Sequence, residues 1–411
     1  MRLSLPLLAT LAVSAAATSA CSSQTTTQTS DAGGDTRTET SDAGADTQSR
    51  VSTVLFVGTD FAKSEAVVVG LEPPSILGRI PIDDGDSVAS ASEDHAFVLE
   101  RTTGLIHVLD PVDRARVSIT LSSTDTPDSG LSNPRAVVVA AGSKAYVLRY
   151  AKNQLKVIDL SGAASSTTID LSSFMAAADP DGLVDVRSGI FDPSTQLAYV
   201  LLQRIDQTDF SGTDPDYVAR CLPVHGAIVG IDTTTDQIVD LNGDTPGTAI
   251  ELLGINPNGA DANGLAFDSS SRQLLVANTG CYEPGQTERS GRGIEAVDLA
   301  TGTSRWLYQT TSTSRVDALV WVNATTSFVQ QGGDWYAWNP TQPTLGNKLS
   351  DFPKAPVYDR AGRIVGLSKA DGGWSVVAFD LANGLTAPLA TSPFLRVDPS
   401  PDYGLTSALV R

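Results

Sequence analysis

One short acidic segment has the spacing of a calcium-binding loop. Asp240, Asn242 and Asp244 alternate along the chain, and Glu251 occupies the twelfth position counted from the first of them. Calcium loops of the EF-hand type take oxygen ligands at positions 1, 3, 5 and 12, so these four side chains predict a calcium site. Thr245 stands where such loops have glycine. A polar turn followed by a strand residue is therefore the alternative explanation.

Other loops are rich in aspartate as well. Their carboxylates are the hard oxygen ligands that calcium prefers, so an ion bound elsewhere on these loops is a second possibility. The aspartates concerned are Asp206, Asp209, Asp214, Asp216 and Asp261.

Four arginines lie near the beginning of apolar runs that are widely separated in the chain. If those runs are inner strands around one axis, the guanidinium groups converge and would bind a carboxylate or phosphate group. Pairing with nearby aspartates such as Asp185, Asp317 and Asp398 is the competing interpretation. The four residues are Arg135, Arg187, Arg315 and Arg396.

The chain has three cysteines, Cys21, Cys221 and Cys281. In an exported protein two cysteines usually oxidise to a disulfide, so we predict a bond between Cys221 and Cys281. The bond would close a loop of about 60 residues and stabilise the fold by roughly 4 kcal/mol in the chain-entropy description. A metal site that adds His225 to the two thiols is the alternative.

Several other chemistries lack their residues. Only three histidines are present, and the sequence contains no G-x-S-x-G, G-x-x-x-x-G-K-[ST], H-E-x-x-H or C-x-x-C-H motif. The formal charge of −19 excludes a nucleic-acid-binding surface, which needs a basic excess.

The composition favours strands and tight turns. The 411 residues include 38 Asp but 9 Glu, and 21 Arg but 7 Lys, with 35 Gly and 22 Pro. Glu and Lys are good helix formers, whereas Asp, Gly and Pro favour turns. We therefore expect an all-β protein.

The N-terminal segment has the features of an export signal. Arg2 is followed by an apolar run over 5–17 and by small residues up to Cys21. The run is too short to span a bilayer as a helix. Ser19-Ala20-Cys21 resembles the lipobox of bacterial lipoproteins, although Thr18 stands where that family usually has leucine. An ordinary signal peptide with an incidental cysteine is the alternative.

The lipoprotein resemblance has consequences for location. It implies cleavage after residue 20 and a lipid on Cys21, and Ser22 in the next position implies the outer membrane of a Gram-negative-type envelope. Residues 22–50 contain no Val, Ile, Leu, Phe, Trp or Tyr, so we expect 21–50 to be a disordered tether. Its typical reach would be roughly 30 Å.

Residues 51–411 repeat one pattern of strands. An apolar segment ending in Asp, a short turn and a further strand recur after two preceding apolar runs. The copies of the segment lie at 66–80, 105–121, 155–171, 227–241, 293–307, 335–349 and 375–389. Four strands in each of seven units predict a seven-bladed β-propeller with antiparallel blades.

The repeat resembles the YVTN/NHL-like propellers of the lactonase-like superfamily, and more distantly WD40-type repeats. The first unit lacks an innermost strand, because 51–58 is already typical of the second one. We therefore expect the C-terminal residues 392–411 to supply that strand and to close the ring.

Two long insertions distinguish blades four and five. They cover 204–226 and 279–293, each between the second and third strands, and 241–262 adds a long passage between the blades. Such loops leave a propeller on one face, which favours a binding surface there. Asn263 begins a segment, N-G-L-A-F, that resembles gluconolactonase-like propellers; the resemblance implies a catalytic metal held by Asn263, with Asp317 nearby. An ordinary start of an inner strand is the alternative.

These patterns predict a monomeric, membrane-anchored binding scaffold at the outer membrane, cell surface or periplasm. Its partner would be an envelope protein or a small ligand, with calcium as the cofactor to be considered. A metal-dependent hydrolase of the lactonase type, with its site at the central channel, is the alternative function.

Overall fold

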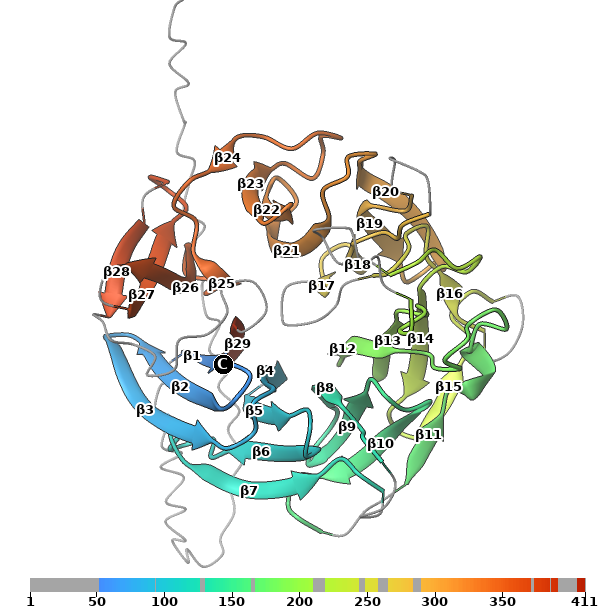
Figure 1. The fold of residues 1–411 in the computed structure, drawn as a ribbon, viewed down its shortest axis with the longest axis horizontal. Coiled ribbons are helices and arrows are strands. Elements are labelled where there is room, and N and C mark those ends of the chain that lie inside the picture. The colour runs from blue at the N-terminus through green and yellow to red at the C-terminus, as the bar shows by residue number, and fades with distance from the viewer. Residues whose placement is uncertain are drawn as a thin grey trace, which may run out of the picture. The chain divides into compact units, whose positions relative to one another are not determined.

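Seven antiparallel sheets are arranged around a common centre in the computed structural model (Figure 1). The chain divides into the units Met1–Gln48 and Ser49–Arg411, and the sheets belong to the second. Six sheets have four strands, and the fourth sheet along the chain has a short fifth strand. The predicted seven-bladed β-propeller is confirmed. The structure describes residues 52–92, 94–125, 130–163, 167–209, 219–243, 248–257, 265–283, 290–370, 373–384, 386–390 and 405–410.

Each blade is named here from its innermost strand outward. Blade one consists of β29 (Leu405–Val410), β1 (Thr53–Thr59), β2 (Ser64–Leu71) and β3 (Pro74–Ile82). Blade two consists of β4 (Ser87–Ser92), β5 (His95–Glu100), β6 (Leu105–Leu109) and β7 (Val117–Ser122). Blade three consists of β8 (Pro134–Val139), β9 (Lys144–Arg149), β10 (Gln154–Asp159) and β11 (Thr168–Asp170). Blade four consists of β12 (Val186–Asp192), β13 (Leu197–Leu202), β14 (Ala227–Asp232) and β15 (Gln237–Val239), with β16 (Ile250–Glu251) as its short fifth strand. Blade five consists of β17 (Leu265–Asp268), β18 (Gln273–Asn278), β19 (Gly293–Asp298) and β20 (Thr303–Gln309). Blade six consists of β21 (Val316–Asn323), β22 (Thr326–Gln331), β23 (Asp334–Trp338) and β24 (Lys348–Leu349). Blade seven consists of β25 (Lys354–Tyr358), β26 (Arg363–Ala370), β27 (Gly373–Asp380) and β28 (Thr386–Ala390). A single turn of 3₁₀ helix, η1 (Ser172–Phe174), precedes blade four.

The two ends of the repeat region close the ring together. Strand β29 pairs antiparallel with β1 from Thr53↔Val410 to Gly58↔Leu405 and is the innermost strand of blade one. The hydroxyl of Thr406 also accepts a hydrogen bond of 2.8 Å from the amide of Ala89 in the next blade. Closure by the C-terminal strand, as the sequence predicts, leaves no sheet edge open at this junction.

Burial differs between middle and outermost strands. Every residue of β1 and β2, the two middle strands of blade one, is buried, whereas the outermost strand β7 alternates between half-buried and exposed residues. Neighbouring blades cover both faces of the middle strands, which explains their apolar runs, and outermost strands face solvent on one side. The hydrophobic clusters accordingly lie between successive blades: one joins Val54 and Phe56 of blade one to Val365 of blade seven.

Aspartates at the ends of third strands organise the turns that follow. The carboxylate of Asp110 accepts hydrogen bonds from the amides of Val112 and Asp113, and that of Asp232 accepts them from Thr234 and Thr235. These bonds lower the pKa of both carboxyl groups. Much of the aspartate excess is therefore local turn chemistry.

Two kinds of connection leave the blades on the same face, which we call the loop face. They are the connections between second and third strands and the passages from one blade to the next. The long connections after β13 and β18 belong to this face, as expected. In blade four the outermost strand is split as well: β15 pairs with 230–232 of β14, and β16 pairs with 227–228.

Candidate functional site: the loop face of blades four and five

A disulfide joins the two long connections. Cys221, in the connection after β13, bonds to Cys281, in the connection after β18, with their Cα atoms 4.8 Å apart. The predicted disulfide is confirmed. The alternative metal site lacks its thiolates in this structure, and His225 lies with Nδ1 2.8 Å from the carbonyl oxygen of Leu252.

Hydrogen bonds extend the contact on both sides of the disulfide. The amide of Cys221 donates to the carbonyl of Tyr282 over 2.9 Å, and the amide of Tyr282 donates to Ala219 over 3.0 Å. The Tyr282 hydroxyl donates to Asp209 Oδ1 over 2.7 Å, while Arg220 forms an ion pair with Asp209 Oδ2 at 3.2 Å. The two loops therefore form one unit, which we call the clasp (Ala219–Cys221, Cys281–Tyr282 and Asp209).

A row of polar side chains connects three blades beneath the clasp. The Tyr150 hydroxyl donates to Gln203 Oε1 over 2.9 Å, and Gln203 Nε2 donates to Asn256 Oδ1 over 2.7 Å. Asn256 Nδ2 then donates to the carbonyl of Gly280 over 3.2 Å. Because Tyr150, Gln203 and Asn256 are all buried, each bond is made away from solvent and fixes the position of its loop.

Two of the four predicted arginines meet at the start of this row. The guanidinium carbon of Arg135 lies 4.8 Å from the ring centre of Tyr150, and that of Arg187 lies 5.5 Å from it. These are cation–π distances. Burial, followed by the charge of Asp185, raises the pKa of Tyr150 to about 12. The structure thus brings together the arginines of blades three and four.

A buried glutamate holds the passage between blades four and five. Glu295 of β19 accepts hydrogen bonds from the amides of Leu253 (2.8 Å) and Gly254 (3.2 Å) and from Asn278 Nδ2 (2.8 Å). Burial raises the pKa of Glu295 despite these three donors. Its carboxylate acts as an anchor for the loop backbone.

Acidic side chains gather where the chain enters blade four. One carboxylate oxygen from each of Asp179, Asp181 and Asp206 lies within 4.8 Å of the other two. Burial and the neighbouring carboxylate of Asp181 raise the pKa of Asp179 to about 6. Burial also raises the pKa of Asp185, which accepts a bond from the amide of Ile205, to about 7.

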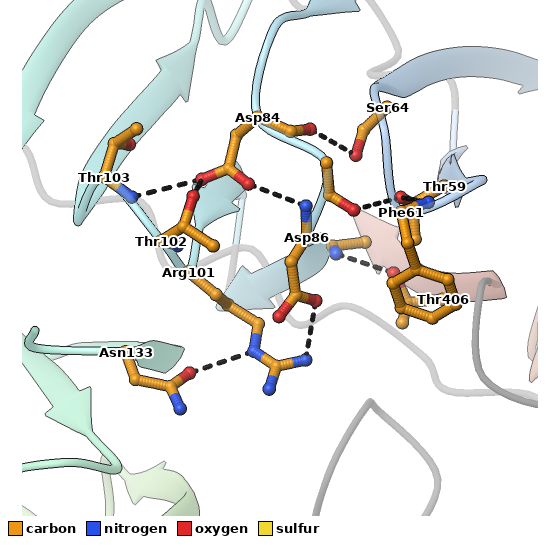
Figure 2. Close-up of polar contacts among 12 residues, drawn as sticks. Thr59, Phe61, Ser64, Asp84, Asp86, Arg101, Thr102, Thr103, Asn133 and Thr406 are labelled. Atoms are coloured by element: carbon orange, nitrogen blue, oxygen red, sulfur yellow. Dashed lines mark hydrogen bonds and ion pairs between the residues drawn. The ribbon is translucent and has the colours of Figure 1, made fainter.

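The corresponding connections of blades one to three are short. Figure 2 shows the polar contacts that hold the entrance to blade two. Asp84, in the passage to blade two, accepts hydrogen bonds from the amide of Asp86 (2.6 Å) and from the amide and hydroxyl of Thr102 (3.0 and 2.5 Å). Arg101 pairs with Asp86 at 2.8 Å and donates to Asn133 Oδ1 over 2.9 Å. Here the buried carboxylate of Asp84 is surrounded by donors, and Asp86 is paired with an arginine.

The predicted calcium loop is only partly described. Asp240 Oδ1 accepts bonds of 3.0 Å from the amides of Asn242 and Gly243, and the Thr248 hydroxyl lies 2.7 Å from Asn242 Oδ1. Glu251 forms an ion pair with Arg204, with Oε1 and Oε2 at 2.7 and 2.9 Å from Nη1. Asp244 lies outside the described residues, so calcium binding at this loop stays a prediction.

The remaining predicted residues fall in two groups. Arg315 and Asp317 lie at the start of β21 and form an ion pair at 2.9 Å, which is the competing interpretation for this arginine. Asn263, Arg396 and Cys21 lie outside the described residues. A metal bound by Asn263 and Asp317, and a convergence of all four arginines, stay predictions.

Sequence reasoning missed Asp179, Asp181, Tyr150 and Glu295. The first two belong to the segment Asp179-Pro-Asp-Gly, which is typical of a turn and carries no metal-binding spacing. Tyr150 and Glu295 stand in ordinary strand patterns, so only their partners in space distinguish them.

Several exposed apolar side chains lie on the loop face. Among the described residues seven large hydrophobic side chains are exposed, and four of them stand on loop-face connections: Phe61, Leu131, Met175 and Leu253. Each of the four stands on a different connection.

Comparison with known proteins defines the fold and no family. No family model matches the chain, and no curated protein does. Among solved structures it is similar to a functionally unknown protein from Desulfotomaculum acetoxidans, with a TM-score of 0.53 and 11% identity over 86% of this chain and 98% of that one. It is similar to the Myceliophteria thermophila Cps50 (Swd1) β-propeller domain, with a TM-score of 0.50 and 9% identity over 83% of this chain and 98% of that one. It is also similar to Kuenenia stuttgartiensis hydrazine synthase, with a TM-score of 0.50 and 10% identity over 82% of this chain and 95% of that one.

These likenesses, with the seven closed blades, define the chain as a β-propeller scaffold. In the part of the chain that the structure describes, no helix is long and apolar enough to cross a membrane.

Proposed function

We propose that the protein is a binding module of the cell envelope that uses its loop face to contact another envelope protein. The observation that carries this proposal is the placement of four exposed hydrophobic side chains on that face, at Phe61, Leu131, Met175 and Leu253. Exposing them costs solubility, and contact with a partner would bury them.

The architecture of blades four and five supports the same proposal. The clasp and the buried row from Tyr150 to Asn256 fix long loops that would otherwise sample many conformations. A rigid binding surface loses less conformational entropy on association. Long loops held in this way are suited to recognition.

The proposal includes a membrane anchor. The resemblance of Ser19-Ala20-Cys21 to a lipobox supports lipidation of Cys21, and Ser22 supports the outer membrane as the destination. Residues 22–50 would then join the anchor to the propeller. The test is Cys21→Ser, for which we expect loss of membrane partitioning on cell fractionation; unchanged partitioning would refute the anchor.

The loop face can be tested by site-specific photo-crosslinking in intact cells. A photoreactive amino acid replaces Leu131 or Leu253 on the loop face, or Val112 as a control on the opposite face. Val112 is 85% exposed, Leu131 50% and Leu253 38%, so the replacements lie outside the buried core. We expect a discrete cross-linked protein from the two loop-face positions and none from Val112.

Equal cross-linking from both faces, or none from Leu131 and Leu253, would overturn the proposed binding surface. The lactonase alternative is not proposed, because no observation among the described residues favours it. Its two candidate residues are Asp317, which is paired with Arg315, and Asn263, which lies outside those residues.

A further inference from the structure

Three carboxylates from two separate connections converge at the entrance to blade four. Asp179 and Asp181 belong to the passage between η1 and β12, and Asp206 belongs to the connection after β13. One oxygen of each lies within 4.8 Å of the others. Asp179 and Asp206 are 9% and 5% exposed, so solvent does little to reduce their mutual repulsion.

The hydrogen bonds of these carboxylates leave one buried oxygen without a partner. Asp181 Oδ1 and Oδ2 accept from the amides of Leu183 and Gln207, each over 2.8 Å, and Asp206 Oδ1 accepts from Thr208 over 2.8 Å. Asp179 Oδ1 accepts from the amide of Asp181 over 3.2 Å. Asp179 Oδ2 is buried and receives no hydrogen bond from any described residue.

A buried carboxylate oxygen without a donor is costly. Basic side chains of these connections do not relieve it, because Arg204 pairs with Glu251 and Arg220 pairs with Asp209. Among the described residues no lysine or arginine forms an ion pair with the three acids. The geometry therefore leaves a position for a cation.

We propose that Asp179, Asp181 and Asp206 bind a calcium ion. Three oxygens within 4.8 Å of one another can share one ion. Calcium accepts carboxylate oxygens from loops in flexible geometry, whereas magnesium demands near-ideal octahedral geometry and usually keeps several waters. Zinc prefers nitrogen and sulfur donors, which this group does not contain. The unpaired Asp179 Oδ2 would become a ligand.

Such an ion would connect the passage into blade four with the loop that leads to the clasp. Asp206 is three residues before Asp209, whose carboxylate holds both Tyr282 and Arg220. Calcium would thus position the loop face without taking part in chemistry. The ion-binding site itself does not depend on the proposed partner.

The test is thermal unfolding and isothermal titration of the full chain with calcium chloride after dialysis against EDTA. We expect 1 mM calcium to raise the unfolding midpoint by roughly 2–5 °C. In Asp206→Asn the acceptor for Thr208 is kept while one charge is removed. We expect this variant to lose the calcium shift, to bind calcium about tenfold or more weakly, and in EDTA to be at least as stable as the wild type.

Asp84→Asn is the matched control, since it removes a buried carboxylate of the same face that is surrounded by donors. We expect it to lower the midpoint with and without calcium and to keep the full calcium shift. If Asp206→Asn does not fold, Asp179→Asn serves the same comparison. The proposal is overturned if the wild type shows neither a calcium shift nor binding heat, if the folded variant keeps both, or if magnesium chloride gives an equal shift.

Discussion

In two regions of the loop face a buried aspartate holds the passage that enters a blade, but the side chains around that aspartate differ. At the entrance to blade two, Asp84 is 5% exposed and is surrounded by the amides and hydroxyl of Asp86 and Thr102 (Figure 2). At the entrance to blade four, Asp179 is 9% exposed and faces the carboxylates of Asp181 and Asp206. Both regions tie a passage between blades to the following second-to-third connection.

The two regions differ in the groups that compensate the negative charge of the buried carboxylate. Donors saturate Asp84, so this carboxylate completes a closed structural unit and needs nothing from outside. Acids oppose Asp179, so that region is complete only with a proton or a cation. A buried carboxylate is thus informative about ligands when its neighbours are acids, and about stability when they are donors.

The largest expected effect is the loss of the covalent link in the long-loop region. We expect Cys221→Ala with Cys281→Ala to lower the free energy of unfolding by about 3 kcal/mol, because the disulfide no longer restricts the unfolded chain. Denaturant unfolding measures this loss. This loss applies to unfolding of the whole propeller. Any added opening of the folded state should be confined to the clasp, because blades one and two have no such bond among their described residues.

Limited trypsin digestion tests whether the loss of the disulfide loosens only the clasp. We expect cleavage after Arg220, within the clasp, to accelerate in the double variant, while cleavage after the exposed Lys63 of blade one stays at its wild-type rate. Equal acceleration at both sites would mean that the disulfide supports the whole ring.

Sequence could predict the features that depend on repetition and counting. The seven copies of one strand pattern define seven blades, and the missing inner strand of the first unit matches the strand at 405–410. The disulfide followed because Cys221 and Cys281 occupy equivalent insertions of neighbouring blades. Arg135 and Arg187 converge for the same reason, since each is the second residue of an inner strand.

The sequence indicated Asp206 as a candidate calcium ligand but not its neighbours Asp179 and Asp181, because their meeting depends on irregular backbone. Asp185 and Arg204 adopt positive φ angles of 53° and 55° in the two connections that carry Asp181 and Asp206. A template of linear spacing selected Asp240 and Glu251 instead, and the structure pairs Glu251 with Arg204. Side chains that meet across loops leave no period in the sequence.

An intermediate effect is expected from breaking the saturated region. Asp84→Ala leaves the amides of Asp86, Thr102 and Thr103 without their acceptor, so we expect a loss of about 2 kcal/mol in the free energy of unfolding. Asp60→Ala is the control: this exposed carboxylate accepts from the amides of the neighbouring turn, which solvent can replace, and the expected loss is below about 1 kcal/mol. Equal losses would show that burial does not distinguish the two.

The smallest effect concerns the turns between third and fourth strands, which occur in both blade two and blade four and lie on the face opposite the loop face. Asp110 of blade two and Asp232 of blade four accept amide hydrogen bonds, and their pKa values are lowered from the ordinary value of 3.8. The ionised form is therefore favoured in the folded state, so its contribution is present above pH 3.8 and is lost as the pH falls through the lowered pKa. Stability should decrease as the pH falls from about 4.5 to 2.

Asp110→Asn and Asp232→Asn each keep a side-chain oxygen as the acceptor but cannot titrate. We expect each to reduce the fall in urea midpoint between about pH 4.5 and pH 2 slightly, and Asp110→Asn somewhat more, because both carboxylates are half-buried but Asp110 also pairs with Arg116. A larger change for Asp232 would mean that the turns of blade four are also coupled to its acidic entrance. A larger change for Asp110 would confine the difference between the two regions to the loop face.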